Sequence, residues 1–228
     1  MLHINNLNKS YPDEKIKAQE FAKKFGMEIV TVDFEHGTES YCIDNPIKNQ
    51  LILAIMIDYG IKNGINNFAL GNNIYEKISE CRVQYGISDS IENFDLFRNG
   101  IKEYIKNINF YDIEIKKNEC YKFVAENYFD AFKYVNSCIS PHRFKKYLNK
   151  TNKEKYNIQP LSETRCMSCY KCAIEYITLS KLGFLQENEQ FKKHCFDIIR
   201  KKSDTIFTTK IANRKSSNEE IERNIFDE

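Results

Sequence analysis

Apolar residues in the first quarter of the chain switch between the spacing of strands and the spacing of helices. Residues 2–7 alternate and residues 27–32 form a β-rich run, which predicts two short strands. Between them a helical stripe ends before Gly26, and this predicts a helix that the glycine closes. The stripe consists of Ile16, Ala18, Phe21, Ala22 and Phe25. A polar loop is expected from Asp33 to Asn45.

The next element is the strongest helical pattern in the chain. It runs from Asn45 to Gly64, has Pro46 near its start and is apolar over most of its circumference. Such a helix is expected to be buried against a sheet. Residues 67–70 then predict a short strand that runs directly into Gly71-Asn72-Asn73.

The second half of the chain predicts more helices than strands. Residues 110–115 and 132–135 have the pattern of strands, and the expected helices are 91–106, 117–127, 170–183 and 186–202. A polar, Lys-rich segment, 146–157, leads to a run of cysteines. From Lys201 the chain is polar and charged, so we expect a poorly ordered tail.

The order of these elements favours an α/β fold. Strand, helix, strand, helix, strand is typical of an open, mostly parallel sheet flanked by helices. We expect an α/β domain over residues 1–136, a helical region with the cysteines over 137–202, and a flexible tail over 203–228.

Composition narrows the classes of protein that fit. The 228 residues carry a net charge of +2, and no basic stripe is interleaved with aromatic residues, which argues against nucleic acid as a partner. No apolar run approaches the ~20 residues of a membrane span, and the N-terminus lacks the features of a signal peptide. A cytoplasmic location follows as an expectation, and there the eight cysteines are metal ligands or reduced thiols rather than disulfides.

The run R-C-M-S-C-Y-K-C, residues 165–172, carries the most specific chemistry, and we call it the knuckle. Its thiols, Cys166, Cys169 and Cys172, stand at i, i+3 and i+6, so they can converge on one tetrahedral metal ion. A site closed by a fourth protein ligand is structural and contributes folding energy. Cys138 is the first candidate for that ligand, and the alternatives are His142, His194 and Cys195. Zinc is expected, with a [4Fe–4S] cluster as the other possibility.

Two further places have the chemistry of anion binding. Gly71 and Asn72 follow a predicted strand, where ligands gather in open α/β sheets. Lys48 and Asn49 stand in the first turn of the buried helix, where free N–H groups favour anions. The ordinary explanation of Gly71-Asn72 is a turn, and that of Lys48 is a solvated surface side chain. His36 in the polar loop is a further titratable group, and no catalytic residue is assigned.

The charged residues beside the cysteines also have two explanations. Arg165 and Lys171 would offset the charge of thiolates, or they are simply surface residues. The chain contains no G-x-x-x-x-G-K-[ST], G-x-G-x-x-G or G-x-S-x-G. This argues against a Walker-type NTPase, a Rossmann dehydrogenase and a serine hydrolase.

Taken in order, these residues resemble a known family over roughly residues 1–182. Pro46, Lys48 and Asn49 match a P-x-[RK]-N helix start, and Gly71-Asn72, Ser137-Cys138 and C-x-x-C-x-x-C follow. This order resembles the 7-cyano-7-deazaguanine synthase group of the PP-loop ATP pyrophosphatases, which have the adenine nucleotide α-hydrolase-like (HUP) fold. The resemblance implies structural zinc on Cys138, Cys166, Cys169 and Cys172, and nucleotide contacts at Lys48, Asn49, Gly71 and Asn72.

The chain also departs from the family pattern. The S-G-G-x-D-S signature for ATP is missing, so the first strand, the pyrophosphate loop and the first helix are expected to be absent. The acidic residue after Gly-Asn is displaced to Glu76, and Met167 replaces the usual glycine after the first cysteine of the knuckle. The stretch between Cys138 and Cys166 is also longer than in the synthases. These departures indicate a divergent relative.

The resemblance implies an activity and its limits. The family adenylates a carboxylate with ATP and Mg²⁺ and releases pyrophosphate, as in queuosine biosynthesis, so an ATP-dependent carbon–nitrogen ligase-like role is implied. Without the loop that holds pyrophosphate, this chain alone is expected to be inactive. The alternative is a non-catalytic, zinc-stabilised module that binds a nucleotide or a protein. The expected partners are a nucleotide or small carboxylate, a second copy of the chain, or an N-terminal partner chain.

Overall fold

The computed structural model describes residues 1–5, 14–33, 45–73, 91–113, 117–134, 138, 142–159, 165–204 and 206–227. Contacts divide the chain into two units, the first formed by Met1–Pro12 and Met27–Lys116, the second by Asp13–Gly26 and Lys117–Glu228. The expected domain boundary at residue 136 therefore falls inside the second unit.

The first unit contains the strands, and both of their pairings are parallel. β1 (Leu2–Asn5) pairs with β2 (Val30–Asp33), and β3 (Asn67–Asn73) pairs with β4 (Asn109–Ile113). The expected parallel arrangement is confirmed to this extent. Among the described residues, however, the strands form two sheets of two strands rather than one open sheet.

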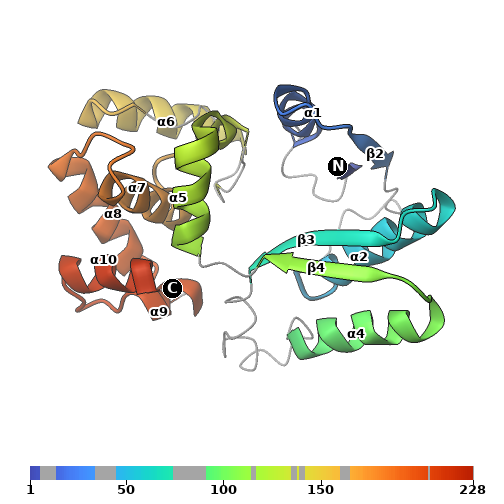
Figure 1. Cartoon of the computed structure of the whole chain (residues 1–228). Helices are drawn as coiled ribbons and strands as arrows, with labels where there is room; N and C mark the ends of the chain where they lie inside the picture. The colour runs from blue at the N-terminus through green and yellow to red at the C-terminus, as the bar shows by residue number, and fades with distance from the viewer. Residues whose placement is uncertain are drawn as a thin grey trace. The chain divides into compact units, whose positions relative to one another are not determined.

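Helices α2 (Asn45–Lys62) and α4 (Ile91–Tyr104) cover the β3–β4 pair, as Figure 1 shows. The helix expected from Asn45 to Gly64 is α2, and its burial against a sheet is confirmed for one side, because the core of this part joins α2 to β3 and to the residue before β4, whereas Ile61 is exposed. The buried members of this core are Leu53, Ile57, Phe68 and Ile108. Gly64 ends the helix in the left-handed region, with a φ of 68°.

The second unit is helical in the part that the structure describes. Its elements are α1 (Glu14–Lys24), α5 (Lys117–Tyr128), η2 (Phe129–Lys133), α6 (His142–Tyr156), α7 (Tyr170–Lys181), α8 (Glu189–Lys201), α9 (Ile206–Ile211) and α10 (Asn218–Asp227). Its main core surrounds α7 and α8 and includes Ile177, Phe191, Ile199 and Ile221. α1 joins this unit through rings, since Phe21 packs on Tyr134 and Phe25 on Tyr128.

Two expectations about the second unit differ from the structure, and a polar segment for which no element was predicted is helical. The strand expected at 132–135 is wrong, because residues 129–133 form the 3₁₀ helix η2. Phe129 and Phe132 are three residues apart, and in this helix both contact neighbouring side chains of the unit. The polar segment 146–157 belongs to a regular helix, α6. The expected disordered tail contains α9 and α10, whose Ile211 and Ile221 are buried in the main core.

The remaining predicted elements agree with the structure within a few residues. The helices at 91–106, 117–127, 170–183 and 186–202 correspond to α4, α5, α7 and α8. The strand of residues 27–32 is shorter, because only Val30–Asp33 pair. No helix in the described ranges is long and apolar enough to cross a membrane.

Candidate metal centre

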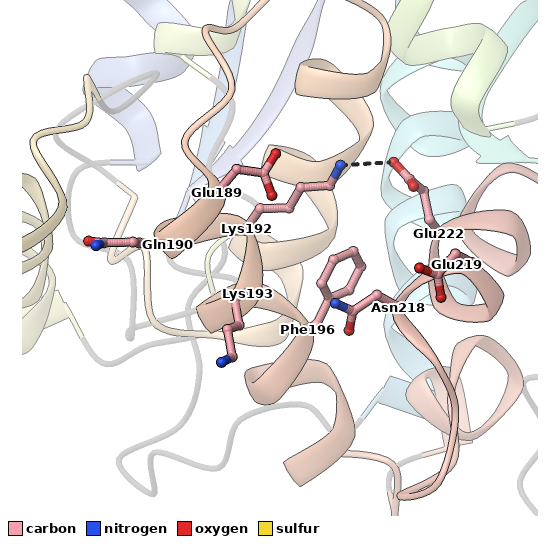
Figure 2. Close-up of a pocket in the computed structure, with 8 residues that line it drawn as sticks. All are labelled: Glu189, Gln190, Lys192, Lys193, Phe196, Asn218, Glu219 and Glu222. Atoms are coloured by element: carbon pink, nitrogen blue, oxygen red, sulfur yellow. Dashed lines mark ion pairs between the residues drawn. The ribbon is translucent and has the colours of Figure 1, made fainter.

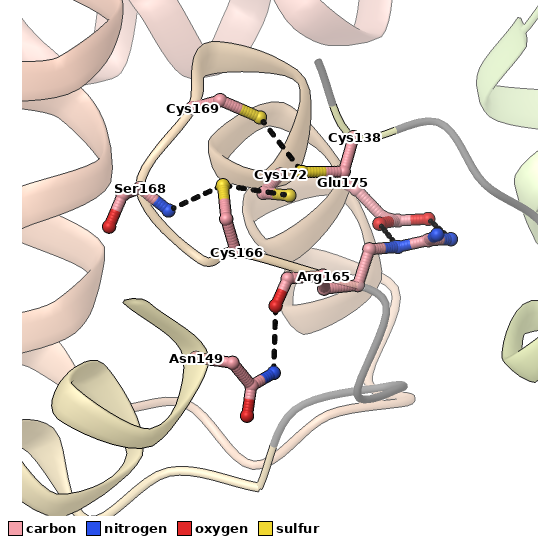
Figure 3. Close-up of polar contacts among 8 residues, drawn as sticks. All are labelled: Cys138, Asn149, Arg165, Cys166, Ser168, Cys169, Cys172 and Glu175. Carbon is pink, nitrogen blue, oxygen red and sulfur yellow. Dashed lines mark hydrogen bonds and ion pairs between the residues drawn. The ribbon is translucent and has the colours of Figure 1, made fainter. Parts of the chain in front are cut away.

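Four cysteines of the second unit lie together around one point. The Sγ atoms of Cys138, Cys166, Cys169 and Cys172 are all within 4.8 Å of one another, and all four residues are buried. Two of these Sγ–Sγ distances are 3.9 Å, from Cys166 to Cys172 and from Cys169 to Cys138 (Figure 3). A disulfide needs about 2.05 Å, so these are separate thiols that converge on a shared site.

The knuckle between Cys166 and Cys169 has a specific backbone shape. Met167 has a φ of 56°, in the left-handed region that glycine favours. This turn brings the backbone N–H of Ser168 to within 3.3 Å of the Cys166 sulfur, to which it donates a hydrogen bond. The side chain of Met167 is buried in the main core, and this burial offsets the unfavourable backbone conformation.

The end of a helix faces two of the sulfurs. Cys169 is the N-cap of α7, and Cys172 lies in the first turn. The N-terminus of a helix carries about half a positive charge, which stabilises negative groups next to it. Thiolates at these positions are therefore favoured over thiolates elsewhere on the helix.

A buried ion pair connects the two sides of the knuckle. The Arg165 guanidinium donates to both carboxylate oxygens of Glu175, at 2.5 and 2.7 Å, and both side chains are almost fully buried (0% and 3% exposed). Arg165 precedes the first cysteine of the knuckle, and Glu175 lies three residues after the last one. The pair thus fixes the entering chain against α7. Arg165 is not a surface residue, and its charge is matched by Glu175.

Two asparagines of α6 hold the other side of the knuckle. Asn149 donates to the carbonyl of Arg165 at 2.7 Å, and Asn152 donates to Ser168 Oγ at 2.6 Å. The Asn152 amide also lies 3.3 Å from the carbonyls of Cys166 and Met167. Both asparagines are buried, so these amides satisfy backbone carbonyls that water cannot reach.

The thiols influence each other strongly. Hydrogen bonds from the other thiols, first from Cys166, lower the pKa of Cys138. Hydrogen bonds to Cys138, first, and to Cys166 raise the pKa values of Cys169 and Cys172, and burial raises them further. Four thiolates in this buried space therefore repel each other unless a cation lies between them.

The alternatives for the fourth ligand lie elsewhere. Cys195 is in the main core, where burial raises the pKa of its thiol. The ring of His194 stacks on Tyr156, with ring centroids 5.2 Å apart. The side chain of His142 is outside those that the structure describes. Sequence reasoning therefore selected the four residues that meet, but it missed Asn149, Asn152 and Glu175, which carried no recognisable motif.

The predicted nucleotide-binding residues belong to the first unit. Lys48 and Asn49 lie at the start of α2, and Gly71 and Asn72 near the end of β3, where the pairing with β4 is irregular between Ala69 and Asn73. α2 is about 27 Å long and β3 about 23 Å. Because a short turn connects these elements, their far ends lie on the same side of this unit. The side chains of these residues, His36 and Glu76 are outside those described.

A separate hollow lies between α8 and α10, and it has no comparable chemistry. Its volume is about 410 Å³ and Lys192 and Glu222 form an ion pair of 3.5 Å in it (Figure 2). Lys192 also pairs with Glu187, and a second cation, Lys193, lines the hollow together with acidic residues.

Comparison of the chain with models of protein families, with curated proteins and with solved structures finds no significant match.

Proposed function

We propose that Cys138, Cys166, Cys169 and Cys172 bind one Zn²⁺ ion in a closed structural site. The observation that carries this proposal is the mutual approach of the four sulfurs within 4.8 Å. Zn–S bonds of ~2.3 Å in a regular tetrahedron give sulfur–sulfur distances of about 3.8 Å, close to the 3.9 Å of the two nearest pairs. All four positions come from protein, which leaves no open position for substrate.

The spacing of the sulfurs favours a single ion over an iron–sulfur cluster. In a [4Fe–4S] cluster each thiolate binds a different iron, so the ligating sulfurs surround the whole cluster. Sulfurs within 4.8 Å of one another leave room for one ion at the centre. Tetrahedral sulfur sites of this kind suit zinc or a single iron, and zinc needs no redox partner.

Elemental analysis of the purified chain tests this assignment. We expect about one zinc per chain, and replacement of Cys166 or Cys172 by serine to lower the zinc content and the stability together. Cys120→Ser is the matched control, since Cys120 is outside the cluster and only half-buried, and it keeps its zinc. Iron with sulfide, or no metal at all, would contradict the proposal.

We also propose that the chain is a divergent relative of the 7-cyano-7-deazaguanine synthases. The order of Pro46, Lys48, Asn49, Gly71 and Asn72 before the cysteines supports this. So does the backbone of Met167, because its left-handed conformation suits the glycine that the family has at this position. In this proposal the zinc fixes the helical unit, and the first unit is the part that handles a nucleotide.

The chemistry of the family defines the test of this second proposal. Adenylation needs donors for the leaving pyrophosphate, and this chain lacks the S-G-G-x-D-S loop that supplies them in the family. We therefore expect negligible ATP–pyrophosphate exchange by this chain alone. Titration with ATP and Mg²⁺ is the second measurement, and binding without exchange would indicate a non-catalytic nucleotide-binding module. If the chain shows neither ATP binding nor exchange, zinc binding is the only function that remains supported.

A further inference from the structure

The helix that holds the knuckle has a second face with a different character. The inner side of α6 carries the buried Asn149 and Asn152, and the outer side carries exposed residues. Among these are Tyr147, which is 68% exposed, and the three lysines Lys150, Lys153 and Lys155. These four residues span the exposed half of the helix, with Lys153 and Lys155 on its two flanks, and we call them the basic face of α6.

The small net charge of the whole chain does not show how strongly positive α6 is. The sequence of α6 contains six lysines or arginines against one acid, Glu154, so its net charge is +5. The whole chain has +2, and the remaining residues together therefore carry −3. Lys150 pairs with Glu154 at 3.8 Å, whereas Lys153 and Lys155 have no carboxylate partner among the described residues.

The positive charge continues onto the neighbouring helix. Lys155 Nζ lies 4.9 Å from the centre of the Tyr156 ring, on which the α8 residue His194 also stacks. Lys155 and the exposed Lys201 of α8 both lie close enough to His194 to lower its pKa, and Asp197 opposes them. The surface where α6 meets α8 thus combines cations with partly exposed rings.

We propose that the basic face of α6 binds the phosphate backbone of single-stranded nucleic acid, with Tyr147 stacking on a base. Lysines attract phosphates without regard to sequence, and each contact releases counterions. Proteins that bind single strands stack the bases on exposed aromatic rings among cations, and this works for any sequence because every base has a π-face. The proposal is independent of the nucleotide proposed for the first unit.

The attachment of α6 argues against a membrane surface as the partner. A helix that lies in a membrane interface buries an apolar face in the lipid. The side of α6 opposite the basic face is fixed to the knuckle by Asn149 and Asn152, so it is not available for insertion. Among the α6 side chains that the structure describes, residues 147–156, Tyr147 is the one large hydrophobic that is exposed.

Binding is measured by fluorescence anisotropy with the full, metal-containing chain. The probes are labelled oligouridylate and oligothymidylate of about 20 nucleotides, a mixed-sequence duplex, and vesicles that contain phosphatidylserine. We expect both single strands to bind, and their affinity to fall as salt rises from about 50 to 200 mM. The comparison of uridylate with thymidylate shows whether RNA or DNA is preferred.

Charge reversal locates the contact. Lys153→Glu with Lys155→Glu is expected to weaken binding to single strands by about tenfold or more and to reduce the dependence on salt. The matched control is Lys210→Glu with Lys215→Glu, two exposed lysines outside α6 and α8, which makes the same change in net charge. Tyr147→Ala is expected to weaken binding to single strands roughly fivefold or more and binding to duplex far less, whereas Tyr147→Phe binds like the original chain.

Four results would overturn the proposal. The first is the absence of binding to either single strand at low salt, and the second is an equal loss of affinity in the two double variants. The third is a loss of affinity in Tyr147→Ala that is as large for duplex as for single strands. The fourth is binding to vesicles but not to nucleic acid. Circular dichroism and zinc content of each variant identify any that fails to fold. In that case Lys153→Gln with Lys155→Gln, which removes the charges without reversing them, decides the same question.

Discussion

At the scale of single residues, Asn149, Asn152 and Glu175 hold the backbone that carries the cysteines of the knuckle. The sequence predicted which sulfurs meet, because three of them are local and Cys138 has the position expected from the resemblance. Nothing in the sequence predicted Asn149, Asn152 or the partner of Arg165. An asparagine that donates to a carbonyl many residues away has no local signature, so such contacts emerge only when the helices are packed.

The pair Arg165–Glu175 gives the first prediction. Glu175→Gln leaves the guanidinium of Arg165, which is 0% exposed, without its counter-charge. Breaking a buried pair from one side costs ~3–5 kcal/mol, and we expect a loss of this size in the free energy of unfolding by urea. Asp58→Asn is the control, because its pair with Lys62 is on the surface and is worth at most about 1 kcal/mol. Equal effects of the two variants would show that Arg165 is not buried as described.

His194 gives a prediction about pH. Burial, first, and then the neighbouring Lys155 lower the pKa of His194, Asp197 opposes them, and Lys201 has the smallest effect, which also lowers it. The folded pKa is therefore below the unfolded value of 6.5, so protonation favours the unfolded chain. The contribution is intact above pH 6.5 and is lost as the pH falls from there through the folded pKa.

The measurement compares the chain with His194→Gln between neutral and mildly acidic pH. Acid also weakens thiolate–metal bonds, and this loss affects both proteins alike. We expect the melting temperature of the original chain to fall more steeply on acidification than that of His194→Gln. Parallel curves would mean that His194 titrates as it does in the unfolded chain.

At the scale of elements, the hydrophobic pattern predicted most of the helices but missed α6 and α10, for different reasons. The inner face of α6 is formed by asparagines, which a hydrophobic pattern scores as solvent-facing. α10 was missed although its start has a recognisable signal. Ser217 accepts a hydrogen bond from the backbone N–H of Glu220 at 3.1 Å, as in an S-x-x-E capping box, and Ile221 and Ile225 follow with helical spacing.

The packing of α2 on β3 gives a prediction for an element. A Cβ added at Gly60 would lie 2.3 Å from the Phe68 ring and 2.9 Å from the carbonyl oxygen of Ile65. The ring can move, but the backbone oxygen cannot, so we expect Gly60→Ala to destabilise the chain by ~1–3 kcal/mol. Gly100→Ala in α4 has no atom within 4 Å and is expected to stabilise it by ~0.5–1 kcal/mol through helix propensity. Denaturant melts of both variants test whether α2 and β3 approach as described, and two stabilising changes would contradict it.

At the scale of the whole molecule, the local elements of the fold were more predictable than their connections. All described strand pairs are parallel, as the alternation of strands and helices implied. The division into two small sheets was not predictable, because pairing joins segments such as Asn67 and Asn109 that are far apart in the sequence. The same reason explains why α1, which is early in the chain, belongs with the helices of the second unit.

The division into two units makes the effect of metal removal testable by region. The four cysteines all lie in the second unit, and metal binding is coupled to folding where the ligands are. Hydrogen exchange of the chain after treatment with a zinc chelator should therefore show faster exchange in α7 and in the end of α6, by at least about tenfold. The amides of α2 and β3 should exchange as before.

Addition of zinc should restore the protection of α7, and addition of magnesium, which prefers oxygen ligands, should not. Faster exchange across both units would mean that the chain unfolds as one cooperative body in which the metal stabilises every element. Unchanged exchange in α7 would mean that the hydrogen bonds of Asn149 and Asn152 and the pair Arg165–Glu175 hold the knuckle without an ion. We expect faster exchange that is confined to α7 and the end of α6. Those contacts fix the backbone of the knuckle, but they do not neutralise four sulfurs that share one buried space.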